Sequence, residues 1–378
     1  MTTTSPISPT PAVSSPTPAQ PTEASVDAFV DRLFGAVLGA QEVQAAYLGD
    51  RLGWYQALAD HGPTTSTELA ERTGTAERYA REWLEHQAAI GWLGVDDVDA
   101  AAGERRFVLA PEQAEVLVDT DSLAHVLPLA RIVASLGRKL DDLAEAYRTG
   151  SGVGWAEHGD DGRESQALAN RPFFLRQLAD DLTAVAEVDD ALRGGAQVAD
   201  IGCGAGWSAI GLALAHPTVT IDGFDVDGPS IDMARAAAAE YGVADRVHFH
   251  AVDVASLDDD HHGAYDVVFA FECVHDMSDP VSVLATMRRL AGDAGTVVVM
   301  DERVGDRFTA PAEPVERLMY GYSLTCCLPD GMAHPPAAGT GTVMRPSTLA
   351  GYAREAGFAG IEVLPIENDV FRFYRLQN

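Results

Sequence analysis

Residues 198–206, Val-Ala-Asp-Ile-Gly-Cys-Gly-Ala-Gly, join an apolar stretch to three alternating glycines, and a helical pattern follows from Trp207. Glycines allow a tight turn and a close approach of the backbone to a ligand, and the following helix presents unpaired N–H groups and its positive dipole end. The segment therefore predicts a cofactor-binding loop with Gly202, Gly204 and Gly206 as contacts.

Asp200, just before these glycines, constrains the identity of the cofactor. A carboxylate here would repel nucleotide phosphates, and Trp207 stands where the dinucleotide fingerprint requires Gly or Ala. NAD is therefore disfavoured. A phosphate-free ligand with a sulfonium and an α-amino group would be attracted instead, which points to S-adenosylmethionine (SAM).

Three further expected strands end in candidate cofactor contacts. The strand at 218–224 leads to Asp225, where an acid can accept hydrogen bonds from two ribose hydroxyls, and the strand at 247–252 leads to Asp253, which could bind an adenine amino group. The strand at 266–271 follows. Open parallel sheets bind ligands at the carboxyl ends of their strands. The complete expected set is Asp200, Gly202, Gly204, Gly206, Asp225, Val226, Asp253, Val254 and Phe271.

Through Asp200–Gly206, Asp225, Asp253 and the strand at 266–271, residues 165–378 resemble the class I SAM-dependent methyltransferases. The resemblance implies that these positions contact the methionine part, the ribose, the adenine and the methyl-transfer cleft, respectively. It also implies an α/β fold, a Rossmann-like seven-stranded domain whose mostly parallel sheet ends in an antiparallel hairpin. The strand patterns at 361–366 and 371–376 fit that hairpin.

Residues 274–279, Val-His-Asp-Met-Ser-Asp, follow the fourth expected strand and resemble the His-Asp-Trp-Ser-Asp segment of plant-type O-methyltransferases. In that group the histidine is the general base, a role that suits an imidazole because it titrates near neutral pH. The resemblance assigns this role to His275 and places Asp301 or Glu302 where an acid orients the histidine or the substrate. Met277 departs from the pattern, so a structural His275 and solvated acids stay open as alternatives.

The N-terminal region predicts a different domain. Short helices at 67–74 and 76–90, followed by strand patterns at 92–95 and 106–109, resemble a winged helix. Small-molecule O-methyltransferases of plants and actinobacteria carry such a domain, which forms a homodimer. We therefore expect a disordered tail at 1–24, a mainly α winged-helix-like dimerisation domain at 25–110, connecting helices at 111–164, and the methyltransferase domain at 165–378 with a substrate or lid insertion near 305–345.

Composition limits the partners. The formal net charge is −31, with Lys139 as the only lysine, which disfavours nucleic acid and anionic membranes. No apolar run is long enough to span a bilayer, and the four cysteines lack metal-type spacing, so a cytoplasmic protein is expected. His248 and His250 share a strand face near Asp253, but ordinary edge-strand residues explain them better than a metal site, and no metal is expected.

The acceptor is not readable from the sequence. Trp155, Met319 and Tyr322 are candidate substrate contacts, with core packing as the alternative. The favoured function is methyl transfer from SAM to a phenol, hydroxyl or carboxylate of a small secondary metabolite, with S-adenosylhomocysteine (SAH) as product. Two alternatives stay open: a non-methylating enzyme that uses SAM for rearrangement or elimination, and a SAM-sensing regulator that binds DNA.

Overall fold

The computed structural model describes residues 23–257 and 261–378 and divides the chain into two units, residues 1–42 and 43–378. Within residues 23–42 there is one helical segment, the first part of α1 (Glu23–Arg51). This helix begins two residues before the expected start at 25, and the rest of the expected tail lies outside the described residues. Its apolar side chains from Val26 to Leu38 are largely exposed.

The second unit opens with the expected winged-helix pattern. Its elements are α2 (Trp54–His61), α3 (Ser66–Thr73), α4 (Glu77–Ala89), β1 (Gly94–Val95) and β2 (Phe107–Val108). The Thr65 side chain caps α3 by accepting a hydrogen bond from the Glu68 backbone N–H at 3.3 Å. In turn, the Glu68 carboxylate accepts one from the Thr65 backbone N–H at 2.9 Å. The antiparallel pair β1–β2 forms the wing.

Connecting helices lead to the sheet: α5 (Pro111–Leu117), α6 (Leu127–Leu136), α7 (Leu140–Thr149), α8 (Gly159–Arg176), α9 (Leu178–Leu182) and α10 (Ala186–Gly194), with short 3₁₀ turns η1 (Gly137–Lys139) and η2 (Trp155–His158). The helix α8 crosses the domain boundary expected at 164/165, so that boundary does not coincide with a break between elements.

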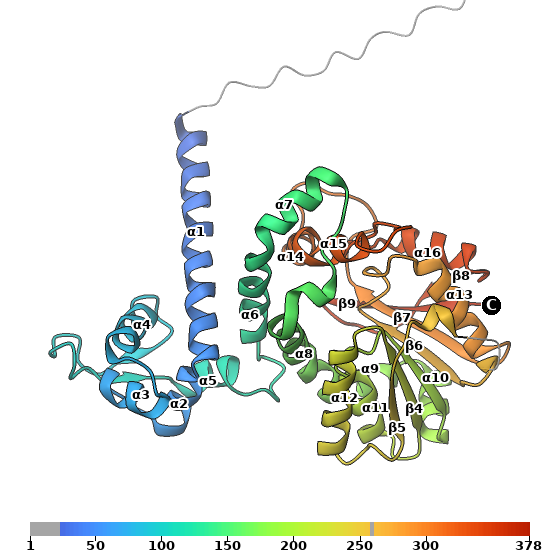
Figure 1. Ribbon diagram of the computed structural model, residues 1–378, viewed down its shortest axis with the longest axis horizontal. Helices are drawn as coiled ribbons and strands as arrows, with labels where there is room; N and C mark the ends of the chain where they lie inside the picture. The colour runs from blue at the N-terminus through green and yellow to red at the C-terminus, as the bar shows by residue number, and fades with distance from the viewer. Residues whose placement is uncertain (1–22, 258–260) are drawn as a thin grey trace, which may run out of the picture. The chain divides into compact units, whose positions relative to one another are not determined.

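In the described residues, seven strands form one sheet in the order β5-β4-β3-β6-β7-β9-β8 (Figure 1). The strands are β3 (Gln197–Ile201), β4 (Thr220–Asp225), β5 (Val247–Ala251), β6 (Val267–Phe271), β7 (Thr296–Glu302), β8 (Gly360–Val363) and β9 (Phe371–Gln377). The first five pair in parallel, whereas β9 runs antiparallel to both β7 and β8. This confirms the expected fold class, and the strand order reverses beside β3, where such sheets bind ligands.

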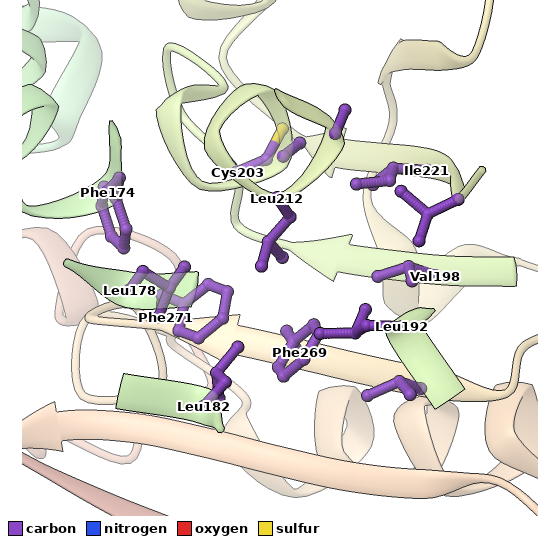
Figure 2. Close-up of a cluster of buried hydrophobic side chains, with 14 of the residues drawn as sticks. Phe174, Leu178, Leu182, Leu192, Val198, Cys203, Leu212, Ile221, Phe269 and Phe271 are labelled. Carbon is purple, nitrogen blue, oxygen red and sulfur yellow. The ribbon is translucent and has the colours of Figure 1, made fainter. Parts of the chain in front are cut away.

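Helices cover both faces of the sheet because successive side chains of each strand point to opposite faces. Val198 and Phe269 pack with α9, α10, α11 (Trp207–Ala215) and α12 (Gly228–Glu240) in one buried cluster, part of which is drawn in Figure 2. Ala199 and Val268 pack with α13 (Pro280–Ala291) and α16 (Pro346–Glu355) in the other. Both faces are therefore buried, which explains the nearly continuous apolar runs of β3, β6 and β7.

The expected insertion near 305–345 contains helices. It holds α14 (Pro314–Tyr322), a π-helical turn η5 (Ser323–Cys327) and α15 (Leu328–Gly331). The 3₁₀ turn η3 (Val254–Ser256) follows β5. π-Helical turns are rare and frequently lie at functional sites, so η5 marks this part of the insertion as a candidate functional region.

Candidate functional site

The glycine loop joins β3 to α11, and all three of its expected glycines have positive φ, between 51° and 78°. A Cβ on Gly202 would lie 2.7 Å from the Cys273 sulfur, and one on Gly206 would lie 2.5 Å from the Phe249 ring. Around Gly204, by contrast, a Cβ would meet no atom within 4 Å. Packing therefore excludes side chains at two positions, whereas Gly204 borders open space where a ligand can approach the backbone.

Asp200 lies at the end of β3 and is 1% exposed. Its Oδ2 accepts a hydrogen bond from the Ser208 hydroxyl at 2.5 Å, whereas its buried Oδ1 has no hydrogen-bond partner in the structure. Burial raises the pKa of this carboxyl to about 7. An unpartnered buried oxygen is costly, and a cationic ligand group would satisfy it. The Asp200 environment thus fits the α-amino group expected of SAM.

Asp225 ends β4, and backbone groups fix its carboxylate from two sides. The Gly204 N–H donates to Oδ2 at 2.9 Å, and the Asp227 N–H donates to Oδ1 at 2.8 Å. Each carboxylate oxygen can accept further bonds, so the group can receive both hydroxyls of a ribose. Burial raises its pKa above the usual range.

The remaining expected cofactor residues have different environments. Val226 is 74% exposed beside Asp225, and Val254 is buried in η3. Asp253 caps η3 by accepting from the Ala255 N–H at 2.9 Å. The Phe271 ring packs in the buried cluster of Figure 2, 5.7 Å from the Phe174 ring. Its side chain therefore packs in the core, and a contact between Phe271 and the cofactor stays a prediction.

The structure brings His275, Asp301 and Glu302 together. His275 is 2% exposed, and its Nδ1 lies 3.0 Å from Asp301 Oδ1 and 3.2 Å from Glu302 Oε2. On the other side of the ring, Nε2 lies 3.1 Å from Asp276 Oδ1. Burial lowers the pKa of His275, but the three carboxylates outweigh burial and hold the pKa well above its usual value. The alternative that Asp301 and Glu302 are solvated surface acids is thus wrong, since they are 1% and 5% exposed.

Sequence reasoning missed Glu272 beside this cluster. Among the described non-glycine residues only Glu272 has a positive φ, 53°, and its buried Oε2 has no hydrogen-bond partner. Burial first, and then the charge of Glu302, raise the pKa of Glu272 to about 8. Strained backbone in non-glycine residues is concentrated at functional sites. A left-handed glutamate after a buried strand leaves no signal in hydrophobic periodicity, so the sequence could not single it out.

The three candidate substrate residues lie in different surroundings. Burial, together with the neighbouring Cys327 and Cys326, raises the pKa of Tyr322 to about 12. The Cys327 sulfur in turn lies within 4.8 Å of a ring nitrogen of His275 and a carboxylate oxygen of Asp276. The backbone N–H of Trp155 donates a hydrogen bond to Asp330 Oδ1 at 2.7 Å, and this bond joins η2 to α15. Met319 is buried in α14, as the packing alternative requires.

Two groups of described residues have the composition of metal ligands, His275–Asp276–Cys327 and His275–Asp301–Glu302. Each uses a ring nitrogen of His275, so a metal would occupy an atom that a general base or its orienting bond requires. His248 and His250 lie on the edge strand β5, and His250 Nε2 is 2.8 Å from Asp222 Oδ1.

We expect chelation to leave activity unchanged. After dialysis against EDTA, assays with and without added Zn²⁺ or Mn²⁺ should give rates within twofold of the untreated protein. The reason is that hydrogen bonding to Asp301 accounts for the position of His275 Nδ1 without a metal ion. Loss of activity on dialysis with recovery on adding metal would contradict this expectation.

Comparison with known proteins agrees with this geometry. A methyltransferase-domain family matches residues 192–323, and an Rv2258c-like winged helix-turn-helix family matches residues 44–119. The ubiquinone biosynthesis O-methyltransferase of Aromatoleum aromaticum is 30% identical over 185 residues, which span 49% of this chain and 73% of that protein. The chain belongs to the SAM-dependent methyltransferases.

Solved structures of SAM-dependent methyltransferases share its fold along almost the whole chain. The mitomycin 7-O-methyltransferase MmcR matches with a TM-score of 0.69 at 23% identity, covering 94% of this chain and all of that one. Human N-acetylserotonin methyltransferase, solved with SAM, matches with a TM-score of 0.66 at 17% identity, covering 96% and 99%. The winged-helix part and the sheet domain therefore occur together in other methyltransferases.

Proposed function

We propose that this methyltransferase transfers the methyl group of SAM to an oxygen of a small molecule, with His275 as general base. The observation that carries the proposal is the buried His275, whose Nδ1 is held by Asp301 at 3.0 Å. The relatives named above as O-methyltransferases support oxygen as the acceptor atom.

Asp200 and Asp225 would hold the two ends of the cofactor. The unpartnered Asp200 Oδ1 suits the methionine ammonium, and the doubly anchored Asp225 suits the ribose hydroxyls. Asp253, with Val226 and Val254, would receive the adenine. When bound, SAM supplies an electrophilic methyl group on a cationic sulfur.

His275 would then take the proton from the acceptor hydroxyl. Asp301 accepts a hydrogen bond from His275 Nδ1–H and fixes the ring orientation, so the acceptor hydroxyl would approach Nε2, on the side of the ring where Asp276 Oδ1 lies at 3.1 Å. The carboxylates raise the pKa of His275, and a positive charge nearby, such as the sulfonium of bound SAM, would lower it and favour the neutral form that a base needs. His275 Nε2 would take the proton of the acceptor hydroxyl as its oxygen receives the methyl group, and the products would be the methyl ether or ester and SAH.

Methyl-labelled SAM tests the reaction. The purified enzyme is incubated with labelled SAM and matched phenols, alcohols, carboxylic acids, amines and thiols, and mass spectrometry locates the label. Label on oxygen supports the proposal, and label on nitrogen, sulfur or carbon overturns the choice of atom. Conversion of SAM without methyl transfer would instead favour rearrangement or elimination.

SAM binding should depend on pH through Asp200. Its pKa of about 7 in the cofactor-free protein lies above the usual 3.8, so the carboxyl is mainly protonated at pH 6 and ionised at pH 8. Because the cofactor ammonium requires the carboxylate, we expect SAM affinity to rise about fivefold from pH 6 to 7, to reach about tenfold by pH 8, and to level off above pH 8. Calorimetry in buffers of different ionisation enthalpy should show proton release at pH 6. A pH-independent affinity would contradict this role for Asp200.

We also propose a homodimer formed through the N-terminal region. Residues of α1 expose apolar side chains, among them Phe29, Leu33 and Phe34, each more than half exposed. Separately, a groove of about 540 Å³ near the winged helix is lined by Trp54, Tyr79 and other residues. Large exposed apolar surfaces mark association sites. Analytical ultracentrifugation should give twice the mass of 40.1 kDa, and the triple substitution Phe29→Glu, Leu33→Glu, Phe34→Glu should give a monomer.

DNA binding receives no support from the winged helix. In α4, Arg78 pairs with Glu82, and Arg81 lies 3.5 Å from Glu77, so this helix presents neutralised arginines.

No helix within residues 23–257 and 261–378 is long and apolar enough to cross a membrane.

A further inference from the structure

Arg163 lies in the first turns of α8 and is buried against Asp227, two residues after Asp225, the proposed ribose contact. Its Nε lies 2.6 Å from Asp227 Oδ2, and its Nη2 lies 2.9 Å from Asp227 Oδ1. The side chains of Arg163 and Asp227 are only 8% and 9% exposed. Two parallel bonds between a guanidinium and a carboxylate fix the relative orientation of both groups.

Asp227 transmits this constraint to Asp225. Its backbone N–H donates to Asp225 Oδ1 at 2.8 Å, and its side chain caps α12 by accepting from the Ser230 N–H at 3.0 Å and the Ser230 hydroxyl at 2.6 Å. The Gly204 N–H holds the other Asp225 oxygen at 2.9 Å. The orientation of Asp225 thus depends on the glycine loop on one side and on the Asp227 turn on the other.

Arg163 also controls charge in this turn. Burial by itself raises the pKa of Asp227, but the hydrogen bonds from Arg163 and Ser230 outweigh burial and lower it. Without the guanidinium, Asp227 would be a buried unpaired carboxylate two residues from Asp225, whose pKa burial already raises. An uncompensated buried charge forces local rearrangement.

The helix that carries Arg163 is itself anchored. Two residues before it, Asp161 accepts from Arg131 Nε at 3.1 Å and from the Tyr47 hydroxyl at 2.8 Å. Arg131 is 6% exposed and lies on α6. Because α8 is held on this second side, the backbone that carries Arg163 is anchored independently of the Asp227 turn.

We propose that Arg163 is a positioning residue for cofactor binding, which clamps Asp227 so that Asp225 presents both carboxylate oxygens to the ribose hydroxyls. This inference rests on the proposed placement of the ribose at Asp225. It assigns no contact between Arg163 and the cofactor, so the effect of Arg163 must depend on the presence of the ribose hydroxyls.

The test measures that dependence with SAH and 2′-deoxy-SAH. Calorimetry gives the Kd of each ligand for the wild type, Arg163→Gln, Arg163→Lys and the control Arg176→Gln, which alters a 56%-exposed arginine of the same helix. We expect the wild type to prefer SAH about tenfold or more. Arg163→Gln should bind SAH at least tenfold more weakly and lose most of that preference, Arg163→Lys should recover part of it, and Arg176→Gln should match the wild type.

Two results would overturn the proposal: unchanged SAH affinity in Arg163→Gln, or an equal loss for both ligands, which indicates a general structural role. If Arg163→Gln does not fold, the double variant Arg163→Gln, Asp227→Asn removes the unpaired carboxylate and keeps the backbone N–H. A wild-type preference in that variant would overturn the clamp, and a reduced preference would support it. Failure of the wild type to bind SAH, or an undiminished preference in Asp225→Ala, contradicts the proposed function instead.

Discussion

His275→Ala should lower kcat by about 10²–10⁴-fold, the range that a positioned general base contributes. The ring nitrogen that would take the acceptor proton disappears, whereas Asp200, Asp225 and the glycine loop stay in place. The Kd for SAM should therefore change much less than kcat. Single-turnover assays with labelled SAM, beside calorimetry on the same preparation, separate the two quantities.

His250→Ala is the matched control for His275→Ala. His250 is an exposed histidine that also contacts a carboxylate, Asp222 at 2.8 Å, but it lies on the edge strand β5. Its loss should leave kcat within twofold. If His275→Ala also stayed within twofold, the acceptor would need no base, and positioning beside the methyl group would account for the rate.

Asp301→Asn distinguishes a base from a buried structural histidine. The amide keeps the shape of the side chain but cannot hold His275 in the same protonation state, because Asp301 accepts at Nδ1 over 3.0–3.1 Å. We expect a large loss of kcat in a folded protein, with thermal unfolding as the control for folding. A purely structural pair would instead lose stability while retaining its rate.

The second large effect is expected at the ribose site: Asp225→Ala should raise the Kd for SAM about a hundredfold or more. Two hydrogen bonds to a charged carboxylate are lost, each worth about 1.5–3 kcal/mol, and the N–H groups of Gly204 and Asp227 lose their acceptor. kcat at saturating SAM should change little, because Asp225 lies away from the reacting atoms in the proposed arrangement.

Asp232→Asn serves as the control for Asp225→Ala. It removes an acid whose side chain is 79% exposed on α12, the helix that follows the ribose-binding turn. Its effect on the Kd for SAM should stay within twofold, since exposed charges are screened. Equal effects of the two substitutions would show that overall charge, and no specific contact at Asp225, attracts the cofactor.

The sequence by itself determined the glycine loop, the strand ends, and the order of a winged helix followed by a methyltransferase domain. The regular alternation of strands and helices places Asp200 and Asp225 at one edge of the sheet, and positive φ at the loop positions requires glycine. The terminal hairpin was also predicted, although β8 ends at Val363, three residues before the expected end. These features are local or periodic, so they leave a readable pattern along the chain.

The resemblance placed Asp301 or Glu302 beside His275, but only the tertiary structure showed that both of them and Asp276 meet its ring, and how Asp225 is held. Asp301 lies 26 residues from His275 in sequence, and Arg163 lies 64 residues from Asp227. Such pairs arise where two elements pack together, and their burial sets the ionisation that the chemistry needs. The direction of the Phe271 ring also depends on the fold: this residue ends a strand, and its ring packs in the core, which its position in the sequence does not reveal. Residue type and spacing identified the candidates, whereas the direction and burial of their side chains depend on the whole fold.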